Sequence, residues 1–146
     1  MAEQNLKDHG PQPYAVDIEA ATLQNSNFRT ALWTGQNLQL TVMSIPVGGD
    51  VGLEVHPDID QFLRLESGRG RAQMGDAEDN LTFDQEVEAD WAVLVPAGTW
   101  HNITNIGDEP MKLYSIYAPP EHPRGTVHPT QADAEAAEAA EEGHQH

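Results

Sequence analysis

The sequence of 146 residues contains no cysteine. Disulfide bonds and thiolate metal sites are therefore excluded, and any bound metal must be held by nitrogen and oxygen ligands. Apolar runs are short, and none approaches the roughly 20 residues that a membrane-spanning helix needs. Residues 1–13 lack an apolar core, so we expect an N-terminal tail there rather than a signal peptide, in a cytoplasmic protein with no membrane partner.

Positive charge is scarce, because seven Lys and Arg residues stand against 24 Asp and Glu residues, for a formal net charge of −17. Such a charge repels nucleic acids and anionic membranes, so we expect neither as a partner. Acidic residues concentrate between Asp76 and Asp90, in a stretch without Lys or Arg. A calcium-binding loop is one interpretation of this stretch, but the glycine and spacing of such a loop are missing. A solvated hairpin edge that resists aggregation is the favoured interpretation.

Short strand-like segments separated by turn residues dominate the chain from residue 14 to residue 118. Regular turn signals without intervening helices predict one all-β domain, a sandwich or barrel, over residues 14–118. We expect its strands at residues 14–18, 28–34, 38–45, 61–66, 69–74, 91–95, 99–106 and 111–118.

The C-terminal part, residues 119–146, differs in composition from the rest of the chain. Pro119 and Pro120 end the last strand, because proline cannot donate to a strand ladder. A Pro-rich exit loop follows, in which we expect His122 and His128 to lie at the surface. Residues 130–142 are rich in Ala and Glu, and Thr130 can cap a helix together with Asp133. We therefore expect a short acidic helix there, and no other helix in the chain.

Two segments carry polar residues with the spacing of metal ligands. Glu54 and His56 are two residues apart, so both would point to the same face of a strand. Gln61 and His101 each begin an inward face that continues with Leu or Ile. If these faces turn into the barrel, four polar groups converge in an apolar interior, which is costly unless a partner satisfies them. A divalent cation is such a partner.

The same two segments resemble the two sequence motifs of the cupin superfamily, which are small double-sheet β-barrels with a metal at the centre. The first motif is commonly Gly-x5-His-x-His-x3or4-Glu-x6-Gly, and the second is commonly Gly-x5-Pro-x-Gly-x2-His-x3-Asn. In this chain Glu54 stands in place of the first histidine, Gln61 in place of the glutamate, and Asp90 in place of the leading glycine of the second motif. The chain reads Gly48-x5-Glu54-x-His56-x4-Gln61-x6-Gly68 and Asp90-x5-Pro96-x-Gly98-x2-His101-x3-Asn105.

The resemblance implies a double-stranded β-helix, or jelly-roll, cupin barrel with a short C-terminal helix. It also implies that Glu54, His56, Gln61 and His101 bind one divalent transition metal, with Zn, Mn, Fe and Ni all compatible with two histidines and one carboxylate. Metal binding should fall as the pH drops through about 6.5, because protonated imidazole cannot ligate. The alternative is a metal-free pocket in which Glu54 and Gln61 hydrogen-bond each other and the histidines.

Two classes of function follow. The first is a small-molecule enzyme that uses the metal as a Lewis acid for isomerase, epimerase or lyase chemistry, or with iron for oxygen chemistry. Tyr117 is the candidate catalytic residue, through its hydroxyl, and a buried tyrosine with a backbone partner is the favoured interpretation of it. The second is a non-catalytic small-molecule-binding or sensor protein. Arg64 alternates away from Gln61 along its strand and is not assigned to the site.

We also expect a homodimer. The resemblance implies a dimer, because cupins of this size are commonly dimers. In addition, two predicted strands carry apolar residues on both faces. These strands are residues 28–34 and 91–95, and a strand that is apolar on both faces needs something to cover its outer side. A second subunit would do so.

Overall fold

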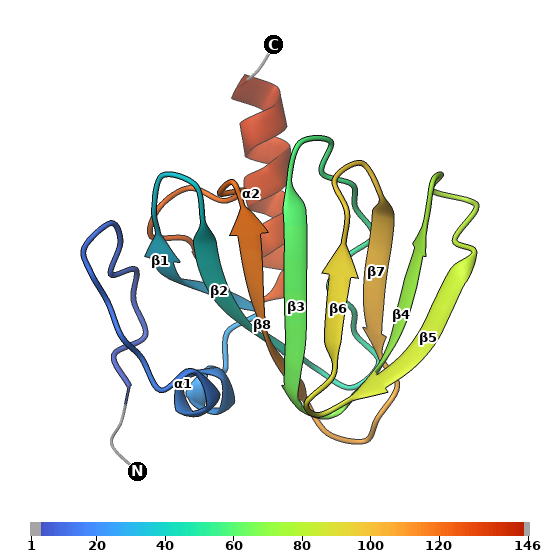
Figure 1. Ribbon diagram of the computed structural model, residues 1–146, viewed down its shortest axis with the longest axis horizontal. Coiled ribbons are helices and arrows are strands. Elements are labelled where there is room, and N and C mark those ends of the chain that lie inside the picture. The colour runs from blue at the N-terminus through green and yellow to red at the C-terminus, as the bar shows by residue number, and fades with distance from the viewer. Residues whose placement is uncertain (1–3, 145–146) are drawn as a thin grey trace.

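Nine strands in the described part of the chain, residues 4–144, form two antiparallel sheets (Figure 1). The computed structural model places them at β1 (Arg29–Thr34), β2 (Gln39–Ile45), β3 (Asp60–Ser67), β4 (Arg69–Gly75), β5 (Phe83–Glu88), β6 (Ala92–Val95), β7 (Trp100–Asn105), β8 (Met111–Ala118) and β9 (Val127–His128). One sheet has the order β6-β3-β8-β2-β1-β9 and the other β5-β4-β7. This is the jelly-roll arrangement expected from the sequence.

The core lies between the two sheets and follows the period of two that strands impose on their side chains. On β3, Gln61, Leu63 and Leu65 are buried, whereas the residues between them are partly exposed. On β7, His101 and Ile103 are buried in the same way. The polar residues predicted to face inward therefore do so, and Arg64 points outward, where it pairs with Glu66 and Asp90.

Seven of the eight expected strands form within two residues of their predicted bounds, but the strand expected at residues 14–18 is wrong. The chain there leads into helix α1 (Ile18–Gln24), which was not predicted. Asp17 caps this helix by accepting a hydrogen bond from the backbone N–H of Ala20 at 3.1 Å. Ala21 of α1 packs against Leu32 and Val42, so burial against the sheet stabilises a helix too short to be stable alone.

Residues 4–16 also lie against the sheet. The Asp8 carboxylate accepts a hydrogen bond from the Thr34 hydroxyl at 2.6 Å and one from the Gly125 N–H at 2.9 Å. Leu6 and Val16 pack on the Leu32 cluster. The outer side of β1 is therefore covered by the chain itself. Residues 1–3 of the expected tail lie outside the described residues.

The acidic stretch forms the edge that the charge pattern indicated. β5 is the outer strand of the three-stranded sheet and pairs with β4, with most of its side chains exposed. Arg71 pairs with Asp84 at 2.5 Å across these two strands, and Arg69 pairs with Glu86 at 3.4 Å. Charged side chains on an edge strand oppose pairing with another chain.

The C-terminal helix forms as α2 (Gln131–His144) and stands over one end of the barrel (Figure 1). The predicted cap is present. The Thr130 hydroxyl donates to the Asp133 carboxylate at 2.8 Å, and the Asp133 backbone N–H donates to the Thr130 hydroxyl oxygen at 3.2 Å. Ala134 is buried in the core, which ties the helix to the barrel. Residues 145–146 lie outside the described part. Across residues 4–144, neither helix has the length and apolar character to cross a membrane.

Candidate metal centre

Backbone pairing places Glu54 directly opposite His101. The Glu54 N–H donates to the His101 carbonyl at 3.1 Å, and the His101 N–H donates to the Glu54 carbonyl at 3.0 Å. Glu54 is an isolated bridge residue beside β7 and His56 lies in a loop, so the single strand expected for these two residues does not form. Their side chains nevertheless converge, because the antiparallel bridge brings Glu54 to the edge of the second sheet.

A tight turn at residues 96–99 holds the loop that carries His56. The Thr99 N–H donates to the Pro96 carbonyl at 3.1 Å, and Gly98 adopts a φ of +81°, which favours glycine. The Gly98 N–H in turn donates to the His56 carbonyl at 2.9 Å. The Pro-x-Gly part of the second motif therefore positions a histidine of the first motif.

Both histidines use Nδ1 for an outer contact, which leaves Nε2 of each ring for the centre. His101 Nδ1 lies 3.1 Å from the Thr99 carbonyl oxygen, and His56 Nδ1 lies 3.5 Å from a carboxylate oxygen of Glu121. An Nδ1–H that donates to these oxygens leaves Nε2 of each ring as the available electron-pair donor. Such an outer hydrogen bond is the usual way in which a metal-ligating histidine is oriented.

Two buried polar atoms near these rings lack hydrogen-bond partners among the described residues: His56 Nε2 and Gln61 Oε1. The Gln61 side chain is oriented by its amide nitrogen, which donates to the Ser115 hydroxyl at 2.8 Å. Gln61 lies opposite Tyr117 in the β3–β8 register, and the Tyr117 ring is 6.0 Å from that of His56. Buried polar atoms are rarely left unsatisfied, so two of them in this region of the barrel indicate an additional group.

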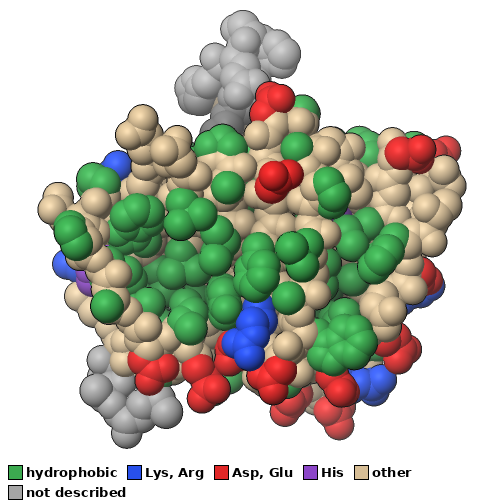
Figure 2. Space-filling model, in the orientation of Figure 1, with side chains coloured by type: hydrophobic (Ala, Val, Ile, Leu, Met, Phe, Trp, Pro, Cys, Tyr) green, Lys and Arg blue, Asp and Glu red, His purple; other side chains and the backbone are tan. Residues whose placement is uncertain are grey.

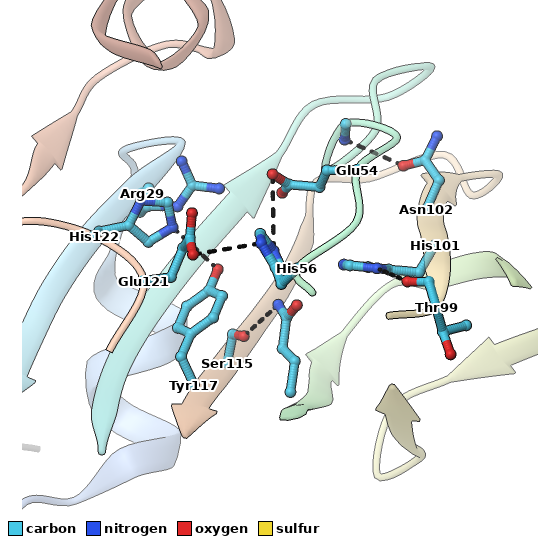
Figure 3. A network of polar contacts seen from close by, with 12 residues as sticks. Arg29, Glu54, His56, Thr99, His101, Asn102, Ser115, Tyr117, Glu121 and His122 are labelled. Carbon is cyan, nitrogen blue, oxygen red and sulfur yellow. Dashed lines mark hydrogen bonds and ion pairs between the residues drawn. The ribbon is translucent and has the colours of Figure 1, made fainter. Parts of the chain in front are cut away.

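The side chains of Glu54, His56 and His101 form a cluster that fits a metal ion (Figure 3). One potential ligand atom from each of the three lies within 4.8 Å of the others, and His56 Nε2 is 3.8 Å from Glu54 Oε2. Among residues 4–140, whose side chains the structure describes, this is the only such group of three. Two imidazoles and a carboxylate form a donor set that suits divalent transition metals.

The carboxyl group of Glu54 is not easily ionised in this setting. Burial raises its pKa from 4.5 to about 7; Arg29 opposes the shift, and Glu138 and Glu121 add to it. A carboxylate in this position is destabilised unless a cation is close. A divalent cation at the centre would remove that penalty.

The two imidazoles are neutral at pH 7, which is the form that ligates. Burial lowers the pKa of His56 from 6.5 to about 4, and the neighbouring His101 and Arg29 lower it further. Burial also lowers the pKa of His101, against the opposing effect of its bond to Thr99. Proton competition at this centre therefore falls on Glu54 rather than on the histidines.

A buried tyrosine–histidine pair lies next to the centre. The Tyr117 hydroxyl is 3.3 Å from Nε2 of His122, and Tyr117 is only 1% exposed. His122 is held by its backbone, since its N–H donates to the Gln39 side-chain oxygen at 2.9 Å and its carbonyl accepts from the Gln39 amide at 2.8 Å. The expectation that His122 lies at the surface is therefore wrong, because Gln39 ties the exit loop into the barrel.

Arg29 is a further buried residue of this region that sequence reasoning missed. It is 1% exposed, its Nη1 lies 3.4 Å from His128 Nδ1, and its guanidinium lies 5.2 Å from the centre of the Phe28 ring. The available signal was an arginine within a strand of apolar and small residues. Arg64, the arginine considered from the sequence, points outward in ion pairs with Glu66 and Asp90.

Comparison with known proteins supports the fold. The model of the cupin domain family matches residues 41–117. The chain is 61% identical to the uncharacterized protein YrkC of Bacillus subtilis over 133 residues, 91% of this chain and 72% of that protein. The crystal structure of BH2720 from Bacillus halodurans matches with a TM-score of 0.88 and 62% identity, over 89% of this chain and 98% of that one.

A more distant neighbour is a cupin-superfamily sugar phosphate isomerase from Silicibacter pomeroyi, with a TM-score of 0.53 and 15% identity over 64% of this chain and 60% of that one. At this identity the similarity shows the fold alone, although it also shows that the fold is used by enzymes. The match over more than half of the chain and the close relatives define the class. The chain belongs to the cupin superfamily, as a small cupin with a Glu/His/His cluster in its barrel.

Proposed function

We propose that Glu54, His56, Gln61 and His101 bind one divalent transition metal, which acts on a small-molecule substrate in the barrel. The observation that carries the proposal is the pair of buried atoms without hydrogen-bond partners, His56 Nε2 and Gln61 Oε1, beside two further ligand atoms. A bound metal would supply Lewis-acid chemistry, polarising a carbonyl or hydroxyl oxygen for isomerase-, epimerase- or lyase-type reactions, or with iron would support oxygen chemistry.

The protein's own residues would hold a proton beside that oxygen. Burial raises the pKa of the Tyr117 hydroxyl and lowers that of His122, so tyrosine keeps the proton at neutral pH. A hydroxyl that keeps its proton beside the proposed metal can donate a hydrogen bond to a substrate oxygen, and His122 Nε2, 3.3 Å away, helps to orient it. The alternative is a non-catalytic binding or sensor cupin, which would use the same hydroxyl only to orient its ligand.

The direct test is metal analysis of the protein purified without a metal-affinity column. We expect close to one equivalent of Zn, Mn, Fe or Ni per chain. Protein that takes up none of these four metals at neutral pH would refute the metal centre and favour the non-catalytic binding function. The cytoplasmic location and the lack of a nucleic-acid partner stay predictions from the sequence.

Metal affinity is expected to fall as the pH drops below about 7. The fall would begin with protonation of Glu54 rather than with protonation of the histidines. Glu54 must lose its proton to ligate, and its pKa of about 7 means that one proton is displaced per metal below that pH. The apparent association constant should therefore fall by up to about tenfold per pH unit between 7 and 4, and more steeply once His56 also takes up a proton. Calorimetric titration with Mn²⁺ from pH 8 to pH 5 measures this slope.

A variant separates the two titrating groups. In Glu54→Gln the fall in affinity just below pH 7 should become shallower, since the pKa of His56 is lowered to about 4 and burial lowers that of His101 as well. An unchanged slope in this variant would assign the proton to another group and contradict the prediction.

We also propose that the chain forms a homodimer through the outer face of β3, β6 and β8. Leu94 is 66% exposed and Trp91 is 44% exposed, and a shallow groove on this face is lined largely by Phe62, Leu94 and Ile116. Hydrophobic side chains gather over the middle of the face shown in Figure 2. Apolar surface of this kind is typical of an interface. β1 needs no second subunit to cover it, because α1 already packs against it.

Light scattering at micromolar concentration is expected to give twice the mass of one chain. Leu94→Asp should shift the mass to that of a monomer, because a carboxylate would be buried at the apolar contact. Val47→Asp is the matched control, since Val47 is also exposed, at 57%, but lies in a loop outside this face. A wild-type monomer, or a dimer that survives Leu94→Asp, would contradict the proposed interface.

A further inference from the structure

Arg29 lies where a negatively charged ligand could meet it. A cavity of about 180 Å³ between the barrel and α2 is lined by Arg29 and Glu54 on the barrel side and by Glu135 and Glu138 on the helix. Arg29 is the basic residue of this wall. One molecule in the cavity can therefore contact both the guanidinium and Glu54, whose carboxylate belongs to the proposed metal centre.

The guanidinium is incompletely satisfied by the protein. Nε of Arg29 is buried without a hydrogen-bond partner among the described residues, and none of the ion pairs formed by side chains of residues 4–140 involves Arg29. Its neighbour at Nη1 is the imidazole of His128 at 3.4 Å. Burying an arginine with an unused donor is costly, and a bidentate carboxylate satisfies such a fork most completely.

The surrounding charges limit the kind of anion. Glu54, Glu121 and Glu138 are the carboxylates that act electrostatically near the centre, and Glu135 adds a fourth on the cavity wall. The metal and Arg29 would together carry three positive charges against these four carboxylates, so a ligand with a single negative charge placed at Arg29 is tolerated better than one with two. A second charge on the ligand would face Glu135 and Glu138, so a phosphate or a dicarboxylate is disfavoured.

We propose that this cupin binds a small monocarboxylic acid bearing a hydroxyl or keto oxygen next to the carboxylate, with Arg29 as the carboxylate-binding residue. The inference rests on the proposed function, because the second oxygen is directed toward the metal held beside Glu54. The cavity is well below the roughly 300 Å³ at which drug-sized ligand pockets begin, so the acid is small. Lactate and pyruvate are probes of this class.

The test compares acids with their neutral amides on Mn²⁺-loaded protein by calorimetric titration. Wild-type protein should bind lactate or pyruvate at least about tenfold more tightly than lactamide or pyruvamide, because only the acids form a charge-assisted pair with Arg29. Arg29→Gln should lose this preference while it retains Mn²⁺, and Arg29→Lys should keep part of it. Arg71→Gln is the matched control, because Arg71 lies at the surface in an ion pair with Asp84.

Each outcome decides the inference separately from the metal centre. Wild-type protein that binds Mn²⁺ but binds neither acid, or binds acid and amide equally, overturns the carboxylate site and leaves the metal site intact. An unchanged preference in Arg29→Gln also overturns it. If Arg29→Gln does not fold, the wild-type comparison and Arg29→Lys decide. If the protein takes up no metal, the same titrations are made on chelator-treated protein, where binding that depends on Arg29 supports the site and its absence refutes it.

Discussion

Replacing His101 with alanine is expected to abolish stoichiometric binding of a divalent transition metal. The imidazole is the strongest type of ligand in this site, and His101 is 2% exposed with its Nδ1 already directed to the Thr99 carbonyl. Loss of an outer-shell partner alone typically costs about 10- to 100-fold in affinity, so loss of a ligand should exceed that range. His56→Ala should have nearly the same effect. Metal titration followed by elemental analysis measures both.

The size of the effect should depend on the ligand type. Gln61→Ala should weaken binding less than either histidine variant, because an amide oxygen is a neutral and weaker donor. His9→Ala is the control, since His9 stacks on Tyr14 at 4.3 Å, outside the site. Circular dichroism of each variant would confirm that the barrel is folded. Equal affinity in His101→Ala and wild-type protein would exclude the proposed ligand set.

Glu54→Gln is expected to have opposite effects on stability and on metal binding. In chelator-treated protein the buried carboxyl has a pKa raised from 4.5 to about 7, so the folded state holds a proton that the unfolded state has lost between these pH values. The wild-type free energy of unfolding should therefore decline as the pH rises from about 4.5 through 7, by up to about 3 kcal/mol. The glutamine variant carries no such penalty and should be the more stable protein at pH 8, by about 1–3 kcal/mol.

Metal should reverse this order. Wild-type protein gains stability on loading, because a ligand that binds only the folded state stabilises it, whereas Glu54→Gln binds more weakly and gains less. Urea unfolding at pH 5 and pH 8, with chelator and with excess Mn²⁺, measures all four combinations. Glu78→Gln is the control, since Glu78 is exposed and should change little in any of them. A pocket that works without metal predicts no reversal, and that result would falsify the role of Glu54 as a ligand.

The barrel interior would have two parts, a metal centre on one side of His56 and a carboxylate-binding region on the other. His101 and His56 lie toward the metal, and Arg29, Tyr117 and His122 lie together on the far side of His56 (Figure 3). α2 covers the cavity between them through Ala134 and Glu138. A small acid held at both ends would place its second oxygen near the metal and its carboxylate at Arg29. This arrangement gives the two variants Glu54→Gln and Arg29→Gln separable effects.

The sequence alone determined most of the strands, the inward face of β3 and the cap of α2. These features depend on local rules: side chains alternate along a strand, glycine permits the turn at Gly98, and Thr130 with Asp133 satisfies the first N–H groups of a helix. For the same reason His101 and Gln61 were predicted to face inward. The two motifs then identified which inward polar residues belong together.

Other features were decided only by the tertiary structure, because they depend on contacts between segments far apart in the chain. Glu54 meets His101 through an isolated bridge rather than along a strand, α1 forms because the sheet buries Ala21, and His122 is buried because Gln39 binds its backbone. Arg29 likewise lies near the site because of contacts with distant segments, such as that with His128. The raised pKa of Glu54 follows burial and neighbouring charges, which no local pattern specifies.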